Sequence, residues 1–174
     1  MQRASLGLTL PMPLECRPLK VIIDEHSLSV SPLMGVPGYA VDTLQGLSGV
    51  ELASDFIICE SSNQEDYQEL LGSVSSGDHH HWVVFAASGQ GDLWLLSKTD
   101  NLVGYYDHNH EGLKRDAISK TGIRLEVWVV LADLIRQLEA RMELRQLTTE
   151  DESEVVMALS SLGVCLHELP FSYF

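Results

Sequence analysis

Two groups of histidines, each flanked by carboxylates, are the residues of this chain best suited to metal chemistry. The first is Asp78 followed by three consecutive histidines, and the second runs from Asp107 to Glu111 with two histidines between them. Imidazole nitrogens and carboxylate oxygens are ligands that Zn²⁺ and Ni²⁺ take in proteins. The candidate metal ligands that this pattern indicates are His79, His81, His108 and His110.

The second histidine group supports an alternative function, that of a metal-dependent hydrolase. The run Asp107-His108-x-His110-Glu111-Gly112-x-x-Arg115 is similar to a stretch of HNH-type endonucleases, in which histidine activates water and a metal holds the scissile phosphate. Those enzymes carry Cys-x-x-Cys pairs on either side, and this sequence has no such pair. We therefore keep the nuclease as the alternative and expect the histidines to be solvated loop residues without a native metal.

The net charge excludes one large class of function. The 174 residues include 11 Lys and Arg against 25 Asp and Glu, for a formal net charge of −14. Between Val21 and His110 thirteen acids face a single base, Lys98, whereas acids and bases nearly balance from Glu111 to Gln146. So acidic a surface repels phosphodiesters, which argues against nucleic acid as a partner. It suits a protein kept soluble by self-repulsion or one that meets a basic protein.

The cysteines and the apolar runs predict a compartment. Cys16, Cys59 and Cys165 are widely spaced and odd in number, which is typical of reduced thiols, and Cys59 lies in an apolar run as a small core residue. Pro11 and Pro13 interrupt the apolar stretch near the N-terminus, and no other stretch approaches the roughly 20 apolar residues that cross a bilayer. We expect a cytoplasmic protein with no membrane partner.

The N-terminal elements that this pattern predicts are few. Prolines break the first forty residues, where only Leu19–Asp24 has the composition of a strand. Residues 55–60 are a better strand, and the capping box Ser62-x-x-Glu65 that follows predicts the start of a helix. Tyr67, Leu70, Leu71 and Val74 give that helix an apolar stripe, and Gly77 is its expected end.

Three apolar runs in the centre predict an antiparallel meander. They cover 82–86, 93–96 and 102–106 and are separated by turns rich in Gly, Asp and Asn. Their continuous hydrophobicity predicts strands that are covered on both faces or lie at the centre of a sheet. Neighbouring strands run in opposite directions, so the two histidine groups are expected at opposite ends of the sheet.

The C-terminal third is predicted to be helical. Residues 125–129 fit either a last strand or the beginning of a helix, and an apolar stripe from Leu131 to Met142 predicts a helix that continues to about Gln146. The capping box Thr149-x-x-Glu152 opens a second helix, with Gly163 as its end. The predicted fold is α+β, a central, mostly antiparallel sheet flanked by helices, with residues 1–146 as one domain and 147–174 as a helical extension packed on it.

The central segment resembles the core of the SUKH superfamily, which includes a yeast cell-wall-synthesis regulator and many bacterial immunity proteins. Gly89, Gly91 and Asp92 match its glycine-rich turn, residues 103–106 its third strand, and residues 131–142 its final amphipathic helix. The family usually opens with a Leu-Pro pair before an aromatic-containing helix, of which Met12-Pro13 is a degraded version. The two elements after Gln146 are not part of the family pattern.

The resemblance implies a non-enzymatic module that needs no cofactor and binds a protein stoichiometrically. In the bacterial relatives the partner is a toxin, often a nuclease, which is basic because it holds nucleic acid. We expect an immunity protein of this kind, as a monomer or a weak homodimer, with the acidic segment facing the toxin. The residues expected to bind the partner are Asp78, Asp92, Trp94, Asp100, Tyr106, Asp107 and Glu111.

Overall fold

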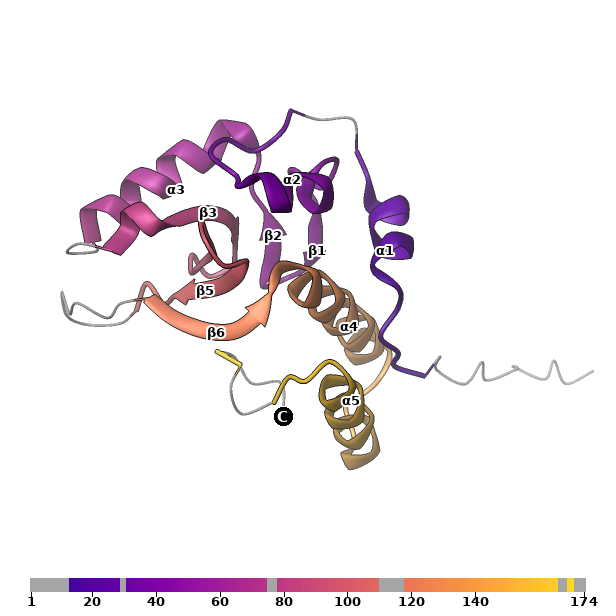
Figure 1. Ribbon diagram of the computed structural model, residues 1–174. Helices are drawn as coiled ribbons and strands as arrows, with labels where there is room; N and C mark the ends of the chain where they lie inside the picture. The colour runs from indigo at the N-terminus through magenta and orange to yellow at the C-terminus, as the bar shows by residue number, and fades with distance from the viewer. Residues whose placement is uncertain (1–12, 29–30, 75–77, 110–117, 166–168, 171–174) are drawn as a thin grey trace, which may run out of the picture.

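The computed structural model describes residues 13–28, 31–74, 78–109, 118–165 and 169–170, and it has the predicted α+β fold (Figure 1). The helices are α1 (Leu19–His26), α2 (Gly38–Leu44), α3 (Ser61–Val74), α4 (Leu125–Leu144) and α5 (Thr149–Ser161), with a short 3-10 helix, η1 (Asp78–His81). The strands are β1 (Glu51–Ala53), β2 (Phe56–Ile58), β3 (Trp82–Ala87), β4 (Leu93–Ser97), β5 (Leu102–Tyr106) and β6 (Ile118–Arg124). They form one antiparallel sheet in chain order.

The predicted meander of β3, β4 and β5 is confirmed. Every residue of β3 and β4 is buried, as their continuous hydrophobicity requires. Gly104 in the middle of β5 is needed for close packing, because a Cβ there would lie 2.9 Å from the ring of Trp82. The glycine thus lets the Trp82 indole cover β5 from two strands away.

A cluster of four aromatic rings joins α4 to the sheet. Trp128 of α4 lies 4.7 Å from Phe85, 5.2 Å from Phe56 and 5.6 Å from Trp94, measured between ring centroids. All four side chains are fully buried, so each removes a large apolar area from water. These contacts hold the last long helix against strands from both halves of the sheet.

Two glutamines of α3 complete the edge of β3 that β2 leaves open. The three-residue strand β2 pairs only with Ala86 and Ala87 of β3. Over the rest of that edge, Gln64 donates to the Val84 carbonyl at 2.9 Å, and Gln68 accepts from the Val84 N–H at 3.0 Å and donates to the Trp82 carbonyl at 3.4 Å. Side chains one helical turn apart therefore satisfy backbone groups that a longer neighbouring strand would otherwise pair.

The segment predicted as the first strand is helical instead. Leu19–Asp24 belongs to α1, in which Ile22 is fully buried and Leu19 and Ile23 pack partly against the core. Their spacing of three and four residues is that of one helix face, and α1 lies against α4. Pro18 stands before the first helical residue, where its fixed φ and missing N–H cost nothing. The β-branched composition of this segment therefore misled the strand prediction.

The ends of the other helices differ from the predictions in detail. Residues 125–129 begin α4, and the last strand is the more polar β6 before it. The capping box of α5 is formed by Thr148 and Asp151, one residue ahead of the predicted pair. α3 starts at Ser61, so Ser62 lies inside the helix, where its hydroxyl donates to the Glu60 carboxylate. Gly77 lies outside the described residues.

Other expectations concern single residues and membrane spans. Gly163 follows α5 with a φ of 72°, as its predicted place at the helix end requires.

Cys59 is buried, and burial raises the pKa of its thiol to about 12, so it is an inert core residue. None of the helices that the structure describes is both long and apolar enough to cross a membrane.

Ion pairs attach the N-terminal segment and α5 to α4. Asp133 of α4 has no exposed side-chain surface and binds Arg17 and Arg136. Burial alone would raise the pKa of this carboxyl, but the two guanidinium groups outweigh it and lower the pKa. Further along α4, Arg141 contacts Asp151 of α5 at 2.6 Å, with both side chains buried. The residues after 146 are therefore held to α4 by charge as well as by apolar packing.

Substitution Asp133→Ala is expected to lower the free energy of unfolding by about 3 kcal/mol, because it leaves two guanidinium groups without their shared buried partner. The matched control is Lys20→Ala, which removes an exposed ion pair with Asp24 and should change stability by less than about 0.5 kcal/mol. Urea denaturation monitored by tryptophan fluorescence measures both changes. Equal losses in the two variants would contradict a structural role for the Asp133 network.

Candidate functional site

The glycine-rich turn between β3 and β4 ends at a buried carboxylate. Gly91 adopts a φ of 99°, which favours glycine, and the Ser88 hydroxyl accepts from the backbone N–H groups of Gln90 and Asp92. A carboxylate at the position of Asp92 could itself accept hydrogen bonds from the turn amides. The serine has that role, and the carboxylate is turned toward β5.

Asp92 joins the turn to the end of β5. Its Oδ2 atom accepts from Tyr105 Oη at 2.6 Å and from Ser88 Oγ at 3.1 Å. Its Oδ1 atom accepts from His108 twice, from the backbone N–H at 3.0 Å and from ring Nδ1 at 2.7 Å. Burial alone would raise the pKa of Asp92, but the hydrogen bonds from Tyr105, His108 and Ser88 outweigh it and hold the pKa below its ordinary value.

A cation would have to compete with this arrangement. Asp92, Asp107 and His108 each present a ligand atom within 4.8 Å of the other two. Both oxygens of Asp92, however, already accept two hydrogen bonds each, and Nδ1 of His108 faces the carboxylate and must carry a proton to donate. The geometry is that of a carboxylate orienting a histidine whose Nε2 faces away from it.

The Ser88 hydroxyl is engaged with the turn, so it is not poised as a nucleophile that the His108 ring could activate.

The two histidine groups lie at opposite ends of the sheet, as predicted. His81 stands directly before β3, whose first residue pairs with the last residue of β4. His108 follows β5, whose last residue pairs with Leu93, the first residue of β4. The structure therefore does not bring His79 or His81 near His108 to form one metal site. His110 lies outside the described residues.

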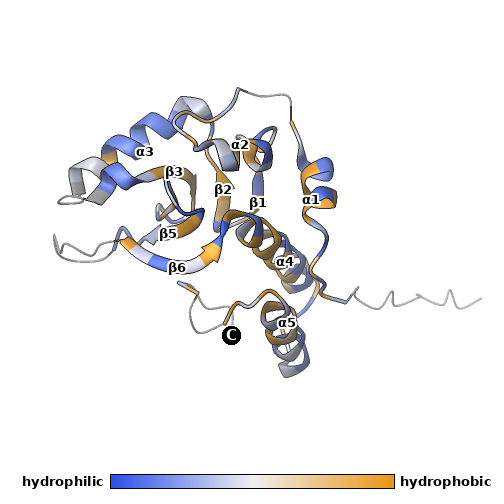
Figure 2. Ribbon diagram, in the orientation of Figure 1, coloured by the Kyte–Doolittle hydropathy of each residue, from blue (hydrophilic) through white to orange (hydrophobic). Residues whose placement is uncertain are grey.

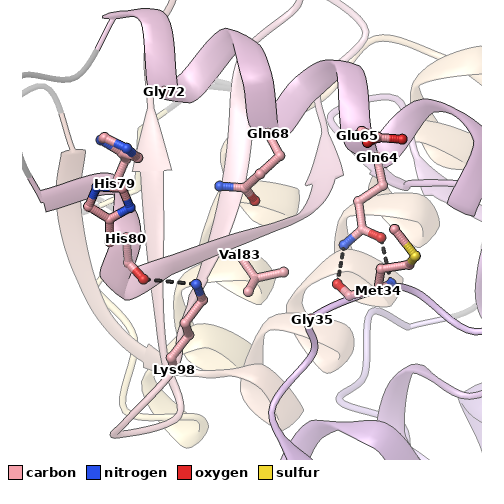
Figure 3. Close-up of a pocket in the computed structure, with 10 residues that line it drawn as sticks. All are labelled: Met34, Gly35, Gln64, Glu65, Gln68, Gly72, His79, His80, Val83 and Lys98. Carbon is pink, nitrogen blue, oxygen red and sulfur yellow. Dashed lines mark hydrogen bonds between the residues drawn. The ribbon is translucent and has the colours of Figure 1, made fainter.

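The first histidine group forms one wall of a pocket of about 520 Å³ (Figure 3). Helix α3 lies along one side, and the loop around Met34 closes another. His79 and His80 lie in contact, with 3.8 Å between their ring centroids, and Lys98 donates from Nζ to the His80 carbonyl at 2.8 Å. The pocket therefore combines basic side chains with the apolar surface of Val83.

The outer face of α3 is acidic and unpaired. Glu65, Asp66 and Glu69 are exposed, and Glu69 lies four and three residues after the other two, one helical turn further on. Figure 2 shows α3 as largely hydrophilic. Among the described residues, none of these three carboxylates makes an ion pair. Leu70, with 42% of its surface exposed, adds an apolar position beside them.

The structure separates the residues predicted to bind a partner. Trp94 is fully buried in the aromatic cluster, and Tyr106 and Asp92 are each 8% exposed, so these three offer a partner almost no surface. Their strands are covered on both faces, as the continuous hydrophobicity of the sequence had predicted. The selection of these residues as partner-binding did not take that burial into account. Asp100 is exposed in the turn before β5, and Asp107 is half-buried after it. The Asp78 side chain and Glu111 lie outside the described part of the chain.

The residues that sequence reasoning missed lie on α3 and at the pocket. The acids of α3 follow its apolar stripe at the same helical period and on the opposite side, which is a readable signal. Lys98 was visible as the single base of a ninety-residue acidic segment. The contact of His79 with His80 carried no such signal, because it depends on the turn that η1 makes.

Comparison with known proteins leaves the family open: no protein-family model, curated protein or solved structure matches this chain.

Substitution Tyr105→Phe is expected to raise the pKa of Asp92 and to lower the free energy of unfolding by about 2 kcal/mol, the typical value of a hydrogen bond to a charged group. Because the folded-state pKa of Asp92 lies below its unfolded value, its carboxylate stabilises the fold above about pH 4 and loses this contribution as the pH falls further. Carboxyl-detected NMR titration measures the pKa, and thermal unfolding at pH 7 and pH 3 measures stability. An unchanged pKa in the variant would show that the hydroxyl does not stabilise the charged form.

Proposed function

We propose that this chain is a non-enzymatic module that binds a basic protein through the outer face of α3. The observation that carries the proposal is the unpaired acidic stripe of Glu65, Asp66 and Glu69. Carboxylates held this way have no partner within the described fold, and they repel one another. A cationic surface that covers them would remove this repulsion and gain charge-assisted hydrogen bonds.

The pairing of charges elsewhere in the molecule supports this assignment. Figure 1 shows α1, α4 and α5 gathered on one side of the molecule and α3 on the other. The ion pairs between side chains of opposite formal charge all join residues of that first side, including those of Arg17, Arg136, Arg141 and Arg145, as far as the structure describes the chain. The acids of these ion pairs stabilise the fold, whereas Glu65, Asp66 and Glu69 of α3 form no ion pair among the described residues and are left for interaction with another molecule.

The order of elements is consistent with the SUKH-like immunity module that the sequence suggested. A short helix with an aromatic residue, α2 with Tyr39, opens directly after Val36-Pro37 and is a closer version of the family's opening than Met12-Pro13. The Tyr39 hydroxyl donates to the Ser97 carbonyl and accepts from the Asn101 N–H, which ties this opening to the β4–β5 turn. The proposed partner is accordingly a basic toxin, and the proposed site of action is the cytoplasm.

The proposal predicts that association depends on charge at α3. Reversing Glu65, Asp66 and Glu69 to Lys should lower the association rate constant with a basic toxin by about tenfold or more at low salt. Because an immunity protein is normally encoded beside its toxin, a basic product of an adjacent gene is the first protein to test. The rate of the variant should also depend less steeply on salt concentration, because screening has less attraction to remove. Surface plasmon resonance from about 20 mM to 500 mM NaCl measures both quantities.

The matched control reverses three exposed acids on the other side of the molecule, Glu143, Glu150 and Glu152. Both triple variants have the same net charge, so any difference between them reports the position of the charges rather than their sum. Equal effects of the two variants would overturn the assignment of the α3 face. Unchanged binding in both would overturn electrostatic recognition as such.

A further inference from the structure

The pocket beside α3 has the features of a small-molecule site, and of the three acids proposed to bind a partner it shares only Glu65. Its volume of about 520 Å³ lies in the range of ligand-binding pockets. It is walled by helix, strand and 3-10 helix, and the Gln64 and Gln68 hydrogen bonds to β3 fix α3 in place. Figure 3 shows Gln68 and Val83 between the histidines on one side and Met34 on the other.

The pocket contains the one cationic side chain of the acidic segment. Lys98 is the only Lys or Arg between Val21 and His110, and it lines this pocket. Its ammonium group uses one of three N–H donors on the His80 carbonyl, which leaves two for a ligand. Lys98 forms no ion pair within the part of the chain that the structure describes. Because no carboxylate of the described chain pairs with it, the Lys98 ammonium group is available to bind an anionic ligand.

Two further donors face the same space. Nδ1 of His79 is enclosed and has no hydrogen-bond partner among the described residues, so a proton on that atom would be buried and unsatisfied. Nε2 of the same ring lies on the side facing Gly72, another residue of the pocket wall. Gln68 spends one amide N–H on the Trp82 carbonyl and keeps the second.

We infer that this pocket binds a small organic carboxylate, with Lys98 holding the anionic group and the apolar body of the ligand lying against Val83 and Met34. The donors of Lys98, His79 and Gln68 match the acceptor oxygens of a carboxylate. Glu65 lines the same pocket, and it disfavours a second negative charge on the ligand. A monoanion is therefore preferred over a phosphate monoester.

The test compares three probes with the same phenyl group: phenylacetate, phenyl phosphate and phenethylamine. Isothermal titration calorimetry gives their affinities, and amide shifts of Gly35 and Gly72 in ¹H–¹⁵N NMR spectra report whether a probe enters the pocket. We expect phenylacetate to bind about tenfold more tightly than phenethylamine and more tightly than phenyl phosphate. Tighter binding of the amine would overturn the anion site, and tighter binding of phenyl phosphate would overturn the assignment to carboxylates.

A pair of variants locates the charge that binds. Lys98→Met should weaken phenylacetate binding about tenfold, the loss expected when one charge-assisted hydrogen bond is removed. Lys120→Met is the matched control, because it removes an exposed lysine from β6 with the same change in net charge and should leave affinity unchanged. Thermal unfolding verifies that both variants are folded. Equal affinity of Lys98→Met and the natural chain would overturn the inference, and this result would not bear on binding of a basic protein to α3.

Discussion

The close packing of Trp128 against three rings of the sheet is the contact on which the rest of the structure depends. It sets the distance of α4 from strands that come before and after α3 in the chain. With α4 in place, Asp133 reaches the arginines that attach the N-terminal segment, and Arg141 reaches α5. Apolar burial thus provides the frame, and the ion pairs select which segments attach to it.

Charge has two separate uses in this molecule. On the α4 side, arginines and carboxylates meet in partly or fully buried ion pairs. Removal of a carboxylate from one of these pairs destabilises the fold. On the α3 side, the acids are exposed and repel one another. The surrounding solvent screens this repulsion, so its cost in stability is small. The same formal charge of −14 therefore says little until its position is known.

Periodicity predicted the parts of the fold in which burial follows local pattern. The meander and the two C-terminal helices have long apolar repeats, whereas α1 was misassigned because Leu19–Asp24 is rich in β-branched residues and short. The polar strand β6 was missed, because its place at the sheet edge leaves most of its side chains outside the core. The site was harder still: strand residues such as Trp94 were chosen for their chemistry, yet tertiary packing buries them.

The hydrogen bonds of Gln64 and Gln68 to β3 have a consequence for recognition. A helix that rests on a sheet through apolar side chains alone can slide or tilt. A shift of α3, in contrast, would leave backbone groups of Val84 and Trp82 without hydrogen-bond partners. The helix therefore presents its outer surface as a preorganised shape. A molecule that binds there meets a surface already in its final form, and it gains affinity because little conformational entropy remains to be lost.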